Sequence, residues 1–132
     1  MDTEHRERLL WRRLQADADK EIESLVRRLP DELRERARTI AVTYEPFPTR
    51  AMLDDDKLDP DLLGLFVGDC YAEMESGATD LPPQILLFLT SIWDYAGHRA
   101  VDFRDEVRRT YLHELGHYLG LGEGDLEVRD LD

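Results

Sequence analysis

The stretch Thr110–Glu123 reads TYLHELGHYLGLGE and contains the pattern H-E-x-x-H, formed by His113, Glu114 and His117. This pattern has chemical meaning only on a helix, where residues four apart lie on the same face. On a helix, His113 and His117 would present two imidazoles to a single metal ion. Glu114 would lie beside them, where a carboxylate can take a proton from a metal-held water and pass it on.

The residues around the pattern predict that it does lie on a helix. Asp102 is a suitable residue to start this helix. Apolar side chains recur at every fourth position on the face opposite the two histidines, as is typical of a helix that packs one side on a core: Phe103, Val107, Tyr111, Leu115 and Leu119. Three glycines predict the end of the helix: Gly120, Gly122 and Gly124.

A zinc ion that keeps one position open for water needs a third protein ligand. From His113 the chain reads H-E-L-G-H-Y-L-G-L-G-E, which resembles the metzincin pattern H-E-x-x-H-x-x-G-x-x-H, whose last position is a ligand. The chain resembles more closely the small bacterial zincin-like metallopeptidase family, formerly classed as a domain of unknown function. The resemblance extends upstream through residues 62–68 (LLGLFVG) and 83–88 (PQILLF), and so covers most of the chain from Ile40 onward.

The resemblance implies a Zn²⁺ ion held by His113, His117 and the residue at the last position of the pattern, which is Glu123 here. The family usually has Asp at that position, and Asp125 is a second candidate for the third ligand. Metzincins also carry a methionine turn after the helix, whereas all three methionines of this chain precede it. The implied activity is hydrolysis of peptide bonds, with Glu114 as general base and then general acid.

The main functional hypothesis is therefore a zinc-dependent metallopeptidase that acts on a peptide or protein substrate. The alternative is a non-catalytic, metal-binding interaction module of zincin fold. The small size of the chain, its atypical third ligand and the missing methionine turn keep this alternative open. The sequence determines neither the substrate and its cleavage preference nor the oligomeric state.

Length and charge fit one acidic domain of 132 residues with a net charge of −13. Residues 1–38 carry ten acidic and ten basic side chains, so the excess negative charge lies in residues 39–132, which argues against a nucleic-acid partner. No apolar run approaches the ~20 residues of a membrane helix, and the charged start lacks the features of a signal peptide. We therefore expect a cytoplasmic protein without membrane contact. The single cysteine, Cys70, excludes an intramolecular disulfide.

The hydrophobic periodicity predicts an α+β fold with a small mixed sheet packed against the metal-binding helix. Residues 1–132 are expected to form a single zincin-like domain, with a helical segment over 1–38 and the sheet and metal helix over 39–132. The expected elements are helices at Glu4–Arg28 and Asp31–Arg38, a short helix at Asp125–Leu131, and strands at Thr39–Tyr44, Leu63–Asp69 and Gln84–Ser91. The aspartate-rich residues 51–62 and residues 93–98 are expected to be loops.

Three side chains near the motif have both a functional and a structural interpretation. His98 is a candidate third ligand, although a loop histidine is more often a surface residue. Tyr95 and Tyr118 are candidates to polarise a substrate carbonyl oxygen, as a phenol can. Tyr118 falls on the core side of the helix, so we expect it to pack there.

Overall fold

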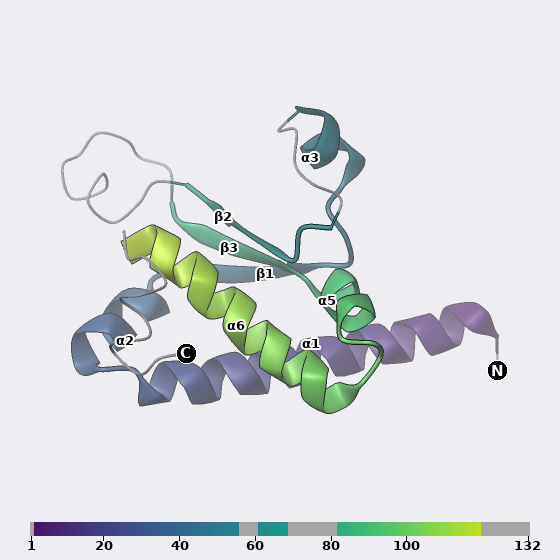
Figure 1. The fold of residues 1–132 in the computed structure, drawn as a ribbon, viewed down its shortest axis with the longest axis horizontal. Helices are drawn as coiled ribbons and strands as arrows, with labels where there is room; N and C mark the ends of the chain where they lie inside the picture. The colour runs from purple at the N-terminus through teal and green to yellow at the C-terminus, as the bar shows by residue number, and fades with distance from the viewer. Residues whose placement is uncertain (1, 56–60, 69–81, 120–132) are drawn as a thin grey trace.

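The computed structural model describes residues 2–55, 61–68 and 82–119. Its elements form an α+β protein, and two short helices at residues 50–55 and 89–95 add to the predicted elements (Figure 1). In chain order, the elements are α1 (Thr3–Arg28), α2 (Asp31–Arg38), β1 (Ala41–Glu45), α3 (Arg50–Asp55), β2 (Gly64–Val67), β3 (Gln84–Phe88), α5 (Leu89–Tyr95) and α6 (Ala100–Leu119). The predicted fold class is confirmed, including the long N-terminal helix, the small mixed sheet and the helix that carries the histidines.

Helix α1 begins at Thr3, one residue before the predicted start at Glu4, and Asp2 caps it. The Asp2 side chain accepts a hydrogen bond of 2.7 Å from the backbone N–H of His5, which would otherwise lack a partner in the first turn. Helix α2 follows after Pro30, whose fixed φ suits the residue before a helix. Both helices bury an apolar side and expose a charged one, and the buried residues are Leu14, Ala18, Leu25, Val26, Leu33 and Ala37.

The sheet has three strands in the order β1-β3-β2. Strand β1 pairs with β3 in parallel, with Ala41 opposite Gln84, whereas β2 pairs with β3 antiparallel, with Gly64 opposite Leu87. The central strand β3 is buried from Ile85 onward, as its unbroken apolar sequence predicts. Strand β2 is therefore one edge of the sheet, and this position matters for the site described below.

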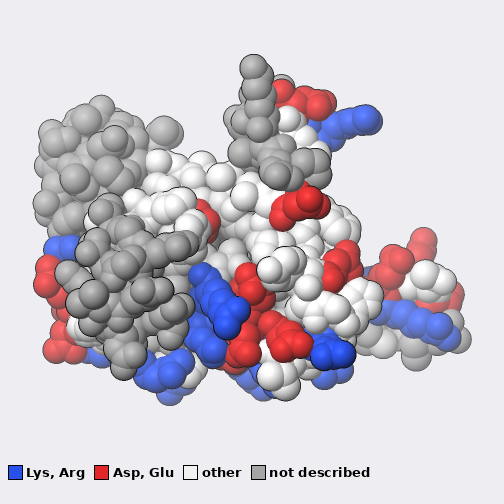
Figure 2. Space-filling model, viewed as in Figure 1, with Lys and Arg blue, Asp and Glu red and all other residues white. Residues whose placement is uncertain are grey.

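Helix α6 packs against α1, α5, β2 and β3. Figure 1 shows it lying over the sheet and crossing α1, with α5 at its start. The apolar stripe predicted from the sequence faces this core: Phe103, Val107, Tyr111 and Leu115 are at most 1% exposed. The charged side chains on the outside of α6 pair along the helix, Arg108 with Asp105 at 2.8 Å and Arg109 with Glu106 at 4.0 Å. Figure 2 shows acidic and basic side chains interspersed over this part of the surface.

Three predicted boundaries were wrong, each for a local reason. The third strand ends at Phe88, and residues 89–95 form α5, because the apolar run that predicted a strand to Ser91 continues unchanged into a buried helix. Residues 93–95, which were expected to lie in a loop, are therefore the last turn of this helix. Part of the expected acidic loop is helix α3, which begins with the hydroxyl of Thr49 accepting a hydrogen bond from the backbone N–H of Met52. The second strand ends at Val67, because the next residue, Gly68, has a φ of +109°.

The other boundaries differ by one or two residues. Strand β1 begins at Ala41 because Thr39 still closes α2, and α6 begins at Ala100, which places Asp102 in its first turn. Cys70, the three glycines after the motif and the expected short helix at 125–131 lie outside the described residues. Among the described residues, no helix is both long and apolar enough to cross a membrane.

Candidate metal centre

The last turns of α6 carry the H-E-x-x-H pattern, with its two histidines at the protein surface. The core side of these turns is fixed by Tyr111, Leu115 and Tyr118, which are at most 2% exposed. This packing sets the rotation of the helix about its axis. His117 therefore points outward with 53% of its side chain exposed, while Glu114 is buried between the helix and its neighbours.

His113, Glu114 and His117 converge on one point. Each contributes one potential ligand atom, and these atoms all lie within 4.8 Å of one another. The two imidazole rings have centroids 4.6 Å apart and planes inclined by 61°. The Nδ1 atom of His117 lies 3.4 Å from Oε1 of Glu114. The two histidines and the carboxylate therefore lie together, as their spacing on a helix predicts.

A cleft of about 330 Å³ borders this group. Its lining residues come from α6 on one side and from β2 and the residues just before it on the other: Leu62, Leu63, Gly64, Glu106, Arg109, Thr110, His113 and Glu114. The sheet edge and the metal helix approach closely because Gly64 has no side chain: a β-carbon there would lie 2.5 Å from Cγ2 of Thr110. The cleft therefore lies between α6 and the start of β2.

The donor set fits a zinc ion. Zinc binds imidazole nitrogen and carboxylate oxygen, and a catalytic site supplies three protein ligands and leaves a fourth position for water. His113 and His117 provide two nitrogens on one face, as the resemblance implies. The predicted third ligands, Glu123 and Asp125, lie outside the described residues, so their role stays a prediction.

His98 has a different environment from the one a ligand requires. It lies between α5 and α6 with a φ of +62°, its Nε2 is 2.7 Å from Oδ1 of Asp94, and its ring stacks on Trp93 with centroids 5.2 Å apart. It is not part of the group formed by the three motif residues. These contacts indicate that His98 has a structural role at the C-terminal end of α5.

The two candidate tyrosines, Tyr95 and Tyr118, have different environments. Tyr118 packs against Phe66 with ring centroids 5.7 Å apart and is 2% exposed, so the expectation that it is a packing residue is confirmed. Tyr95 is 70% exposed and lines a second depression of about 490 Å³ together with Phe47, Leu63 and Asp94.

Several residues of the cleft were not identified from the sequence. Thr110 and Glu106 lie three and seven residues before His113, so the helical repeat alone was a sufficient signal for them. Gly64 had no comparable signal. Its contact with Thr110 depends on how the sheet docks on α6, which a local pattern does not contain.

A short mixed sheet beside a helix that bears H-E-x-x-H is the arrangement of the zincins, a class of metallopeptidases. The comparison with known families agrees: the model of the zincin-like metallopeptidase family matches residues 37–131, and the chain belongs to this family. A comparison with curated proteins found no match. The family and the His-Glu-His group together fit a zinc peptidase.

Proposed function

We propose that this protein is a zinc metallopeptidase that hydrolyses peptide bonds through a metal-activated water, with His113 and His117 as ligands and Glu114 as general base and acid. The observation that carries the proposal is the convergence of these three side chains beside the cleft between α6 and the start of β2. We further propose Glu123 as the third ligand, with Asp125 as its substitute, because they follow the motif at about the spacing that its resemblance implies.

The ion would supply a Lewis acid for the scissile carbonyl and would lower the pKa of its water to about 7. The two histidines, on a helix whose orientation is fixed by its core packing, would hold that ion. The Glu114 carboxylate, buried next to them, accepts the proton of the attacking water. It then donates this proton to the departing amine, so that the same group acts first as base and then as acid.

The cleft also suggests how a substrate is held. Strand β2 is an edge strand of the sheet, and Leu63 and Gly64 lie in the wall of the cleft. An extended peptide can pair with such an edge through its backbone, which gives affinity with little dependence on side chains. We therefore propose that the substrate is an extended peptide or an extended segment of a protein. We also propose that this protein acts in the cytoplasm.

The test is metal analysis of protein purified without added zinc, combined with the change Glu114→Gln. We expect one zinc per chain in both forms and hydrolysis of a quenched fluorescent peptide library by the native protein alone. The loss in Glu114→Gln should be about 10²–10⁴-fold, as is usual for a general base. Glu35→Gln is the matched control, because Glu35 is exposed on α2 and is not a member of the metal group.

The possible results separate the two functional hypotheses. Equal turnover in the native protein and Glu114→Gln would contradict the role of Glu114. Full zinc occupancy without turnover of any peptide would instead favour the non-catalytic, metal-binding interaction module.

A further inference from the structure

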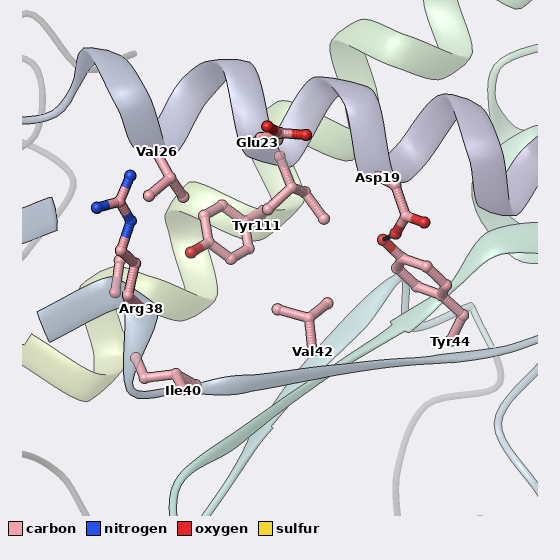
Figure 3. A pocket seen from close by; sticks show the side chains of 10 residues that line it. Asp19, Glu23, Val26, Arg38, Ile40, Val42, Tyr44 and Tyr111 are labelled. Atoms are coloured by element: carbon pink, nitrogen blue, oxygen red, sulfur yellow. Dashed lines mark hydrogen bonds between the residues drawn. The ribbon is translucent and has the colours of Figure 1, made fainter. Parts of the chain in front are cut away.

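Another pocket, distinct from both the metal cleft and the depression at Tyr95, lies on the side of the molecule where α1, α2 and β1 meet (Figure 3). Its volume is about 450 Å³, within the ~300–1,000 Å³ range of small-molecule sites. It shares none of its lining residues with the cleft. Asp19, Glu23 and Val26 come from α1, Arg38 from the end of α2, Ile40 and Val42 from the start of the sheet, and Tyr111 from α6.

Tyr111 gives the pocket a buried polar group that has no partner among the described residues. Its side chain is 1% exposed, and its hydroxyl makes no hydrogen bond within the described part of the chain. A buried hydroxyl normally has a partner, because leaving it unpaired costs free energy. Tyr44, which lines the same pocket, is satisfied: its hydroxyl donates to Oδ1 of Asp19 at 2.5 Å.

The pocket has charges of opposite sign at its two ends. Figure 3 shows Arg38 at one end and Asp19 with Tyr44 at the other, with Val42 between them, and the Tyr111 hydroxyl pointing toward the Arg38 end. Among the described residues, Arg38, Asp19 and Glu23 take part in no ion pair. The walls between the two ends are apolar and consist of Ile22, Val26, Ala37, Ile40 and Val42.

We propose that this pocket binds a small zwitterion with an apolar body, namely a free apolar amino acid or a short peptide with free ends. The carboxylate would lie against the Arg38 guanidinium and accept the unused hydrogen bond of Tyr111. The ammonium would lie against Asp19, and the apolar side chain against Val26 and Val42. A ligand with only one charge leaves one end of the pocket unmatched, whereas a zwitterion matches both.

Tyr111 makes this site relevant to the metal centre. It lies on α6 two residues before His113, so a ligand held by its hydroxyl contacts the helix that carries both histidines. The proposal itself does not depend on peptidase activity, because its test measures binding alone.

The test uses the full chain labelled with ¹⁵N and three probes: leucine, the dipeptide leucyl-leucine and N-acetylleucinamide. The third probe keeps the apolar side chain but has neither charge. The dipeptide is added to Glu114→Gln, so that hydrolysis cannot remove it. We expect leucine or the dipeptide to shift the backbone amide signals of Val42, Ile22 and Tyr111, and N-acetylleucinamide to bind at least about tenfold more weakly. Of leucine and leucyl-leucine, the one that binds more tightly shows whether the natural ligand is an amino acid or a short peptide.

Two pocket variants and two matched controls make the test specific. Tyr111→Phe and Arg38→Gln should each weaken binding by about tenfold. Tyr95→Phe and Arg12→Gln, which change the same residue types outside the pocket, should leave it unchanged. Thermal unfolding of each variant checks that it is folded.

Three results would overturn the proposal. The first is no signal shift with either zwitterion up to about 10 mM, a concentration that would detect even millimolar affinity. The second is equal binding of N-acetylleucinamide. The third is binding that neither Tyr111→Phe nor Arg38→Gln weakens while both remain folded.

Discussion

Gly64 on the edge strand and Thr110 on the metal helix are in such close contact that no other residue type fits at position 64 without movement. A β-carbon at Gly64 would lie 2.5 Å from Cγ2 of Thr110, and 3.3 Å from both the carbonyl oxygen of Leu86 and a methyl carbon of Leu87. Thr110 precedes His113 by one helical turn. The separation of β2 from the metal centre is therefore set by the absence of one methyl group.

This contact predicts the effect of Gly64→Ala. The added methyl group must push β2 away from α6, because the threonine side chain is short, branched and 8% exposed and cannot rotate out of the way. We expect a loss of about 1–3 kcal/mol in the free energy of unfolding, as is usual for overpacking. The proposed peptidase activity should fall as well, because the cleft between α6 and the start of β2 changes its width. Denaturant unfolding and turnover of a fluorescent peptide measure the two effects.

The double variant Gly64→Ala/Thr110→Ser separates this contact from other causes. Serine lacks Cγ2, the atom that the new methyl group would meet, so the two changes together should recover most of the stability lost by Gly64→Ala. A double-mutant cycle with a coupling energy near zero would show that the strain lies elsewhere, for example against the backbone of β3.

The proposed zinc site predicts a clear difference in metal binding among three histidines. His113→Ala and His117→Ala should each remove bound zinc, because each deletes one imidazole from the group of ligand atoms within 4.8 Å of one another. His98→Ala should keep zinc at the native level, because its ring stacks on Trp93 and its Nε2 faces Asp94. Metal content after gel filtration measures all three. Loss of zinc from His98→Ala at native stability would return His98 to the list of ligands.

The metal helix could be predicted from the sequence because its signal is local. The spacing of His113 and His117 and the apolar repeat through Phe103 and Leu115 are both properties of a single helix. The prediction of β3 was correct only to Phe88. Both faces of this segment are buried, so the chain shows no change of period where the strand becomes α5.

The parts that could not be predicted depend on contacts between distant segments. Nothing near Gly64 in the sequence indicates that it lies against Thr110. The pocket beneath Tyr111 is similarly formed by three helices and a strand, and the sequence presented Tyr111 only as a member of an apolar stripe. That its hydroxyl finds no partner in residues 2–55, 61–68 and 82–119 is a property of the assembled fold.

The third ligand is open to a direct test, although Glu123 and Asp125 lie outside the described residues. We predict that Glu123→Ala lowers the affinity for zinc by at least about tenfold, the usual minimum cost of weakening a metal site. Asp125→Ala should lower it less, because Glu123 occupies the ligand position of the motif. Competition with a zinc-binding dye measures both affinities. The reverse order would assign the ligand to Asp125, and no loss in either variant would require a ligand from elsewhere in the chain.

The last prediction concerns alkaline stability. Burial raises the pKa of Tyr111 to about 12 from an ordinary value of 10.0. Burial, followed by the hydrogen bond to Asp19, also raises the pKa of Tyr44. Below pH 10 these phenols are neutral in both the folded and the unfolded chain. Between about pH 10 and 12 the unfolded chain loses the Tyr111 proton while the folded chain keeps it, so the free energy of unfolding must fall as the pH rises.

For Tyr111 a shift of this size corresponds to at most about 3 kcal/mol. Tyr111→Phe removes this pH-dependent contribution. The free energy of unfolding of the variant should therefore fall less steeply than that of the native protein across the same pH range. At neutral pH the variant should be as stable as the native protein or more so, because it loses no hydrogen bond and removes an unpaired buried hydroxyl. Tyr95→Phe, which changes an exposed phenol, should follow the native curve. Urea unfolding at pH 7, 9, 10 and 11 measures all three proteins. A Tyr111→Phe variant destabilised at pH 7 would show that the hydroxyl has a partner in the folded protein, and would remove the main support for a ligand in the pocket.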